Sequence, residues 1–293
     1  MRVLLIGSNS YVGRRVADYF EEKLDFIGSY HNKPNPKLKK QVQLDMNNLD
    51  GMAKALAEIR PDLVIVPAGI SDTNARKEDA FTINAKGTSN IIEAAKKTGI
   101  EGKIIYFSTD CVFDGVKGWY SESDKPNPIT DYGRSKVAAE GFVREHPDHI
   151  IMRLPLILGP TESDDNHENF LTKFIKSGNG MKVFKDVYRT MTYVKDIPRI
   201  IERIVEKDFT GTINVSSGHL LSYRDMAQTM NQNLYPQRIY ETVKCDDPLI
   251  PKKLGLKNNL LLKEIGYEPL GFDQTVRETF KEMNIRMEWE ALR

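Results

Sequence analysis

The chain has 293 residues, which is enough for one large domain or for two unequal ones that share a sheet. Hydrophobic residues make up 40% of it and the formal net charge is +1, so it lacks the charge excess that is typical of proteins binding nucleic acid or an anionic membrane. Its two cysteines, Cys111 and Cys245, lie far apart and outside any CxxC pair. This spacing argues against a disulfide framework or a zinc site, so we expect no metal and a reducing, cytoplasmic compartment.

Short apolar runs alternate with segments of helical periodicity through the first half of the chain. The runs predict strands at residues 3–6, 26–28, 63–66, 104–107 and 150–152, and the periodic segments predict helices at 12–22, 49–59, 80–98 and 132–145. No apolar run is long enough to cross a bilayer, and no membrane association is expected. The rhythm favours an α/β fold with a doubly wound, Rossmann-like parallel sheet and helices on both faces.

The rhythm loosens after Arg153. Helices are predicted at residues 169–176, 197–205, 222–231 and 272–283, with a short strand at 212–215. We therefore predict a dinucleotide-binding domain over residues 1–153. Residues 154–293 are expected to form mainly a smaller substrate-binding region, with a chain that crosses back to the first domain.

A glycine-containing turn follows the first predicted strand and opens the first predicted helix. It reads Gly7-Ser8-Asn9-Ser10-Tyr11-Val12-Gly13, a Gly-x-x-Ser-x-x-Gly spacing that departs from Gly-x-Gly-x-x-Gly. Glycines in such a turn let the backbone approach a pyrophosphate, and the helix N-terminus offers free N–H groups. An ordinary strand-to-helix turn is the alternative. The position in the first βαβ unit favours nucleotide binding, with Ser10, Tyr11 and Val12 among the cofactor contacts.

The second predicted strand indicates which nicotinamide cofactor binds. A carboxylate at its end would bind the ribose 2′-hydroxyl of NAD, but residues 28–33 contain none. Lys33 would suit a 2′-phosphate, although a surface lysine needs no such role. Asp45, after the next short strand, is a candidate partner for the adenine amino group. We expect NADPH as the cofactor, with NADH possible.

Tyr132 and Lys136 stand four residues apart after the turn-rich run of residues 124–128. If that run starts a helix, both side chains share one face. A lysine charge beside the phenol lowers the phenol's pKa. Bringing the pKa down from about 10 by about three units requires roughly 4 kcal/mol of differential interaction. The tyrosine would then be a proton donor suited to carbonyl reduction. A chance pair on any helix is the alternative.

Together these features resemble the extended short-chain dehydrogenase/reductase superfamily. Its landmarks are matched by Gly7, Gly13, Asp45, residues 67–69, Asn84 and residues 108–110, with Tyr132 and Lys136 at the expected distance. Within the superfamily, the stretch from Phe107 to Gly115, Phe-Ser-Thr-Asp-Cys-Val-Phe-Asp-Gly, looks most like the dTDP-4-dehydrorhamnose reductase family. Residues 120–122 and 128–136 agree with that family too.

The resemblance implies a catalytic set of Thr109, Tyr132 and Lys136. Tyr132 would protonate the carbonyl oxygen, Lys136 would lower the tyrosine pKa and hold the nicotinamide ribose, and Thr109 would donate a hydrogen bond to the developing alkoxide. Ala68, Gly69 and Asn84 are the further cofactor contacts that it implies.

The resemblance further implies NAD(P)H-dependent reduction of a 4-keto group on a nucleotide-linked deoxysugar. Substrate contacts are expected from Cys111, Leu156, Asn169 and Arg189, whose guanidinium suits a diphosphate. A nucleotide sugar is thus the expected partner, and a homodimer is possible.

Two departures lie near the expected sugar pocket. The reductase family usually has tyrosine at Cys111 and tryptophan at Leu156, so the rhamnose substrate stays open. Superfamily dehydratases carry Asp-Glu after the threonine, whereas this chain has Asp110-Cys111, which argues against dehydration. Two alternatives stay open: a nucleotide-sugar 4-epimerase, and an NADP-binding module resembling the regulatory subunit of methionine adenosyltransferase.

Overall fold

The computed structural model describes residues 1–70, 76–161, 168–234 and 239–284. Within these residues, seven strands form one sheet in the order β12-β7-β5-β4-β1-β2-β3, and every neighbouring pair in it is parallel. The strands are β1 (Arg2–Leu5), β2 (Asp25–Tyr30), β3 (Gln41–Gln43), β4 (Leu63–Val66), β5 (Lys103–Thr109), β7 (His149–Leu154) and β12 (Gly211–Asn214). The order reverses between β1 and β4, so the doubly wound parallel sheet predicted from the sequence is confirmed.

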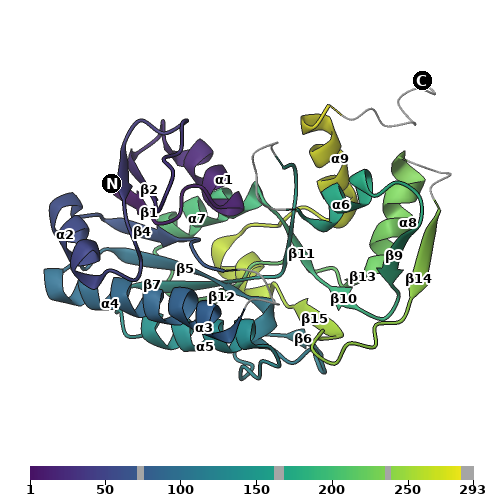
Figure 1. Ribbon diagram of the computed structural model, residues 1–293. Helices are drawn as coiled ribbons and strands as arrows, with labels where there is room; N and C mark the ends of the chain where they lie inside the picture. Colours follow the sequence, from purple (N-terminus) through teal and green to yellow (C-terminus); the bar gives the residue numbers. More distant parts are fainter. Residues whose placement is uncertain (71–75, 162–167, 235–238, 285–293) are drawn as a thin grey trace.

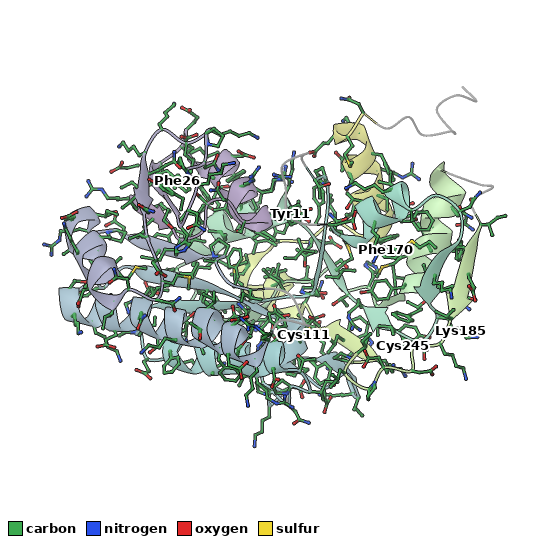
Figure 2. All side chains as sticks on the ribbon, viewed as in Figure 1. Tyr11, Phe26, Cys111, Phe170, Lys185 and Cys245 are labelled. Atoms are coloured by element: carbon green, nitrogen blue, oxygen red, sulfur yellow. The ribbon has the colours of Figure 1, made fainter. Side chains whose placement is uncertain are left out.

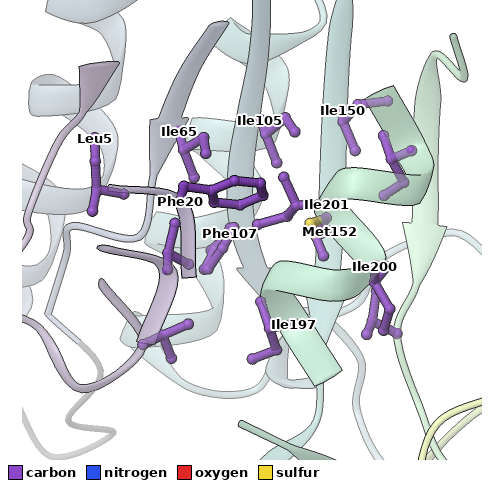
Figure 3. Close-up of a cluster of buried hydrophobic side chains, with 14 of the residues drawn as sticks. Leu5, Phe20, Ile65, Ile105, Phe107, Ile150, Met152, Ile197, Ile200 and Ile201 are labelled. Atoms are coloured by element: carbon purple, nitrogen blue, oxygen red, sulfur yellow. The ribbon is translucent and has the colours of Figure 1, made fainter. Parts of the chain in front are cut away.

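Helices cover both faces of this sheet (Figure 1). Successive residues of a strand point to opposite faces, so Val3 and Leu5 join one hydrophobic cluster while Leu4 and Ile6 join another. The first cluster packs under α1 (Tyr11–Phe20) and α7 (Asp196–Glu206), as Figure 3 shows. The second packs under α2 (Leu49–Ile59), α4 (Gly87–Thr98) and α5 (Asp131–Val143).

Both α7 and β12 come from the second half of the chain. Ile197, Ile200 and Ile201 of α7 are fully buried in the first cluster, and β12 pairs with β7 at the edge of the sheet. The chain therefore leaves the sheet after β7 and returns to it before its end.

Most of the remaining elements form a small lobe beside the carboxyl ends of the strands (Figure 1). Its helices are α6 (Phe170–Lys176), α8 (Tyr223–Leu234) and α9 (Phe272–Glu282), which share a hydrophobic cluster centred on Phe174 and Phe280. Its strands form a sheet of β13 (Leu221–Ser222), β10 (Tyr188–Arg189), β15 (Lys253–Leu256) and β6 (Gly118–Tyr120), and two pairs, β11 (Met191–Tyr193) with β8 (Leu156–Leu158) and β14 (Tyr240–Val243) with β9 (Met181–Phe184). We use "large lobe" for the seven-stranded sheet with its helices.

Candidate active site

The turn after β1 is closed by its own hydrogen bonds. Ser10 caps α1: its hydroxyl donates to the Gly7 carbonyl at 2.9 Å and accepts from the Gly13 N–H at 3.0 Å. Gly7 has a φ of +99°, a conformation that favours glycine, and a Cβ on Gly13 would lie 2.1 Å from the Gly7 oxygen. The tight turn thus requires glycine at both positions and presents the N-terminus of α1 at the reversal point of the sheet, where such sheets bind nucleotides.

The loop after β4 lies against this turn. The Ala68 N–H donates to the Ile6 carbonyl at 3.2 Å, and a Cβ on Gly7 would lie 2.8 Å from the Ala68 Cβ. Gly69 has a φ of +151°, and a Cβ there would be 2.7 Å from Asn84 Oδ1 and 3.7 Å from Lys136 Nζ. At Gly7 and Gly69 the backbone of both loops is therefore open to close approach by a ligand. This fits a dinucleotide that lies across the sheet from Gly7 to Lys136.

Lys33 and Asp45, the two residues predicted to contact the adenosine end of the cofactor, lie at the surface. The Lys33 carbonyl accepts from the Asn9 side chain, so the lysine backbone adjoins the phosphate-binding turn while its side chain is exposed. Asp45 is exposed and accepts from the Asn47 N–H at 2.9 Å, which caps the turn before α2. Lys33 thus lies beside the phosphate-binding turn. The hydrogen bond of Asp45, by contrast, stabilises only the turn before α2.

Thr109 and Tyr132 come together from different elements. Thr109 is the last residue of β5, and Tyr132 lies in the first turn of α5, whose N-cap Thr130 accepts from the Gly133 N–H at 3.0 Å. Both are buried, with 6% and 8% of their surface exposed. Two polar hydroxyls therefore meet at the carboxyl end of a central strand.

Lys136 lies one turn further along α5 and is also buried. Its ammonium donates to the Phe107 carbonyl at 2.6 Å and stands 4.4 Å from the centre of the Tyr106 ring. Burial lowers the pKa of Lys136 to about 7, although the negative charge of Glu140 acts in the opposite direction.

The expected lowering of the Tyr132 pKa is wrong for this geometry. Burial raises the pKa of Tyr132 well above its ordinary value, the nearby Cys111 acts in the same direction, and the Thr109 hydroxyl opposes them. Lys136 is not among the groups that shift this pKa, and its ammonium donates to the Phe107 carbonyl. Desolvation of Tyr132, which the spacing of Tyr132 and Lys136 does not reveal, sets the direction of this pKa shift.

Asn84 holds the two cofactor-facing segments together. Its amide donates to the Ile70 carbonyl at 3.1 Å and to Ser135 Oγ at 3.0 Å, and its Oδ1 accepts from the Ile70 N–H at 2.9 Å. It lies in a π-helical turn, Phe81–Lys86, which connects α3 (Lys77–Ala80) with α4. Such turns frequently occur at functional sites. Here the turn directs Asn84 between the loop after β4 and helix α5.

A buried ion cluster fixes α5 against the sheet. Glu140, two turns after Tyr132, is fully buried and accepts from Arg153 at 2.9 and 2.8 Å. It also accepts from Ser108 Oγ at 2.6 Å and from Arg144 at 2.8 Å. Burial alone would raise the pKa of Glu140, but the hydrogen bonds and charge of Arg153 outweigh it and lower the pKa. The cluster ties α5 to β5 and β7, and it was not foreseen from the sequence.

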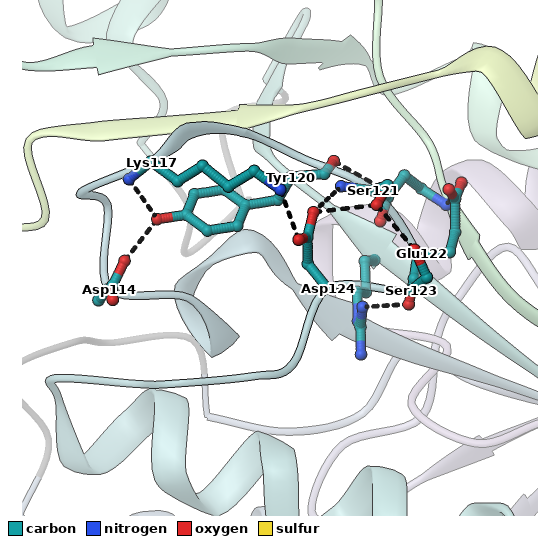
Figure 4. A network of polar contacts seen from close by, with 9 residues as sticks. Asp114, Lys117, Tyr120, Ser121, Glu122, Ser123 and Asp124 are labelled. Atoms are coloured by element: carbon teal, nitrogen blue, oxygen red, sulfur yellow. Dashed lines mark hydrogen bonds and ion pairs between the residues drawn. The ribbon is translucent and has the colours of Figure 1, made fainter.

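The segment between β5 and α5 is held by its own polar network (Figure 4). Tyr120 donates to Asp114 and accepts from the Lys117 N–H, and Asp124 accepts from Ser121 and Lys117. The Tyr120 ring stacks on Phe113 at 4.2 Å between centres. This packing supports the short 3₁₀ turn Asp110–Val112, which directly follows Thr109.

A cavity of about 540 Å³ opens between the two lobes above these residues. It is lined by Thr109 and Tyr132 and by all four predicted substrate contacts, Cys111, Leu156, Asn169 and Arg189. Asn169 caps α6 and donates to the Tyr11 hydroxyl at 3.2 Å, so it links the small lobe to the first helix of the large one. In Figure 2, Cys111 lies toward the large lobe and Phe170 toward the small lobe. The volume suits a ligand of nucleotide-sugar size.

The predicted site residues did not include several lining residues, among them Asp110, Tyr223 and Ile250. Asp110 could have been predicted as a site residue, because it directly follows Thr109. Tyr223 comes from α8, and no motif in the sequence around it indicates a role in the site. Cys111 is half-buried in the cavity wall, and desolvation raises the pKa of its thiol to about 12, which disfavours the thiolate. Within the described residues, no group of three His, Cys, Asp or Glu side chains could hold a metal ion, and no helix is long and apolar enough to span a membrane.

Comparison with known proteins decides the family. The model of the RmlD substrate binding domain matches residues 1–284. The chain belongs to this family. A solved dTDP-4-dehydrorhamnose reductase from Bacillus anthracis in complex with NADP is 26% identical, with a TM-score of 0.81 over 96% of this chain and 98% of that one. The family predicted from the sequence is confirmed, and the predicted enzyme class and cofactor agree with this relative.

Two curated relatives of the family have different roles. The probable low-salt glycan biosynthesis reductase Agl14 of Haloferax volcanii is 27% identical over 237 residues, which cover 78% of each chain. Methionine adenosyltransferase 2 subunit beta of Danio rerio is 28% identical over 219 residues, which cover 70% of this chain and 64% of that protein. Family membership alone therefore does not identify the reaction, which depends on the residues of the site.

Proposed function

We propose that this protein uses NAD(P)H to reduce the 4-keto group of a nucleotide-linked deoxyhexose, as in dTDP-4-dehydrorhamnose reduction. The proposal rests on one observation: Thr109 and Tyr132 line a cavity of about 540 Å³, with Lys136 one helical turn away. Similarity to a reductase solved with NADP supports it.

Bound at the reversal point of the sheet, NAD(P)H would supply the hydride. Tyr132 would give its proton to the carbonyl oxygen. Thr109, whose hydroxyl donates to Asp110 Oδ1 in this structure, would turn that O–H to the same oxygen as negative charge develops there. Lys136, whose ammonium carries three donors, would hold the nicotinamide ribose. Arg189, which also lines the cavity, suits the diphosphate of the nucleotide because a guanidinium binds phosphate oxygens through two donors.

The first test is turnover. The protein is mixed with NADPH or NADH and a panel of dTDP-, UDP- and GDP-linked 4-keto-6-deoxyhexoses, and the loss of absorbance at the reduced nicotinamide band is followed. Tyr132→Phe should lower kcat by about 10²- to 10⁴-fold, the usual contribution of a general acid. Tyr240→Phe, in β14 and outside the cavity lining, is the matched control and should keep the wild-type rate. Full turnover by Tyr132→Phe would refute the assigned acid.

A binding role is the second candidate, and the similarity to methionine adenosyltransferase 2 subunit beta favours it. Under that role the protein binds NADPH, as seen in a raised unfolding midpoint, but oxidises it with no sugar of the panel. An epimerase would instead retain NAD through purification and interconvert C4 epimers without net oxidation.

A further inference from the structure

Tyr11, predicted to contact the cofactor, is hydrogen-bonded to Asn169, predicted to contact the substrate. Tyr11 is the first residue of α1 and stands in the turn between Gly7 and Gly13, where its backbone would adjoin the pyrophosphate of a bound dinucleotide. Its side chain reaches the small lobe, and the phenol oxygen accepts from Asn169 Nδ2 at 3.2 Å. Figure 2 shows Tyr11 on the side of the large lobe that faces the small lobe. One side chain therefore joins the two proposed ligand sites.

Asn169 extends this contact into the wall of the cavity. Its Oδ1 caps α6 by accepting from the N–H groups of Leu171 and Thr172 at 3.0 and 3.2 Å, and its Nδ2 also donates to the Gly159 carbonyl at 2.8 Å. Asn169 lines the cavity, whereas Tyr11 lies outside the lining. Because 7% of Tyr11 and 3% of Asn169 are exposed, water competes little for the hydrogen bond between them. The position of the phenol thus affects how the start of α6 is held.

Arg15 makes a second contact from α1 to the small lobe. It is 5% exposed, its Nη2 donates to the Pro160 carbonyl at 3.0 Å, and its guanidinium carbon lies 5.4 Å from the centre of the Tyr11 ring. Pro160 follows β8, whose residues Leu156 and Ile157 line the cavity. Helix α1 is therefore bonded to two parts of the cavity wall, to the cap of α6 and to the residues that follow β8.

These contacts connect cofactor binding with the order of the cavity wall. When the backbone of the turn holds a pyrophosphate, Tyr11 loses freedom of motion at the start of α1. Its phenol then holds the cap of α6 in one position, and a second ligand meets a wall that is already ordered. Ordering by a first ligand lowers the entropic cost of binding the second, which gives positive coupling without a large change of shape. Each ligand must strengthen the binding of the other by the same factor.

We propose that Tyr11 is a positioning residue that couples the two sites, so that NADP(H) bound at the turn strengthens the binding of a nucleotide sugar in the cavity. The inference rests on the proposed function for the identity of the second ligand, but the coupling itself needs no reaction. Tyr11→Phe keeps the ring and leaves the hydrogen bond of Arg15 to Pro160 in place. The variant therefore tests the phenol hydroxyl and not the attachment of the two lobes.

The test uses a cofactor that cannot reduce the sugar. NADP⁺ has no hydride to give, so the dissociation constants of dTDP-, UDP- and GDP-linked 4-keto-6-deoxyhexoses are measured by calorimetry with and without saturating NADP⁺. In the wild type NADP⁺ should lower the dissociation constant of the bound sugar by at least about fivefold, the lower end of ordinary coupling between sites. In Tyr11→Phe this ratio should fall to within about twofold, since one hydrogen bond of the usual strength accounts for about fivefold.

Tyr19→Phe is the matched control. Tyr19 lies in the same helix, but its hydroxyl donates to Glu202 of α7 at 2.5 Å, away from the cavity lining. This variant should keep the wild-type ratio. Tyr11→Phe should also keep the wild-type affinity for NADP⁺ alone, because the substitution leaves the backbone of the turn unchanged.

A merely structural role of Tyr11 gives a different result. If Tyr11→Phe weakens the binding of both ligands but retains the wild-type ratio, or if NADP⁺ leaves the sugar affinity of the wild type unchanged, the inference is overturned while the proposed reduction stands. If the wild type binds none of the sugars, the proposed function fails, and hydrogen–deuterium exchange decides the inference. NADP⁺ should then slow exchange of the α6 amides by at least about threefold in the wild type and not in Tyr11→Phe. Unchanged exchange in the wild type, or equal slowing in both proteins, overturns the role of Tyr11.

Discussion

Replacing Glu140 by Gln tests whether the buried ion cluster holds α5 against the sheet. The substitution keeps the side-chain shape but leaves the guanidinium of Arg153, which is 1% exposed, without its carboxylate. Removing one partner of a buried pair costs about 3–5 kcal/mol, and the amide oxygen retains part of the bonding, so we expect about 3 kcal/mol. At about 2 °C per kcal/mol for a chain of this size, Tm should fall by about 6 °C.

The assay is urea or thermal unfolding, followed by circular dichroism, together with NADPH turnover. Glu145→Gln is the matched control, because Glu145 pairs with Lys96 at the surface, where both side chains are about half exposed. Such a pair contributes at most about 1 kcal/mol. If Glu140→Gln costs no more than Glu145→Gln, the assignment of the cluster as a major stabilising contact is wrong.

The pH dependence of the same variant gives a second test. A carboxyl whose pKa is lowered by folding stabilises the native state above its unfolded pKa, and this stability is lost as pH falls through the folded value. The stability difference between the wild type and Glu140→Gln should therefore be largest near neutral pH and shrink below about pH 4.5. A difference that grows on acidification contradicts this account.

Three further predictions concern the site itself. Folding lowers the pKa of Lys136 to about 7, so the burial of this lysine destabilises the protein most at low pH. As pH rises from 7 to 10, the stability of the wild type relative to Lys136→Met should therefore increase, as measured by urea unfolding at fixed salt. Gly69→Ala should weaken NADPH binding at least about tenfold in a fluorescence titration, because its Cβ would meet Asn84 Oδ1 at 2.7 Å and the φ of +151° disfavours alanine. Cys111 should react with iodoacetamide at pH 8 far more slowly than free cysteine, since burial raises its pKa to about 12; equal rates would contradict the burial.

The sequence was sufficient for the elements that carry long periodic patterns. The predicted helix at residues 49–59 is α2 and the predicted strand at 63–66 is β4, with the same bounds, and Tyr132 and Lys136 share α5 as their spacing indicates. Thr109 was found through the resemblance of residues 107–115 to the reductase family, and it is the last residue of β5.

What the sequence did not reveal depends on contacts between distant segments. Strands of two residues, such as β10 and β13, have no period to detect, and Tyr223 reaches the cavity only because α8 packs there. The direction of the Tyr132 pKa shift follows from desolvation, which is a property of the assembled cavity and not of a spacing.

The return of the chain to the large sheet has a consequence for synthesis. When residues 1–154 have left the ribosome, β7 is complete but its partner β12 is still to be made, and Ile150 and Met152 lack their cover from α7. The nascent chain therefore presents a sheet edge and an apolar face until the segment up to Asn214 has emerged. Such a partly built sheet is prone to pair with other chains. Translation of residues 155–214 is thus the interval in which this protein most needs protection from aggregation.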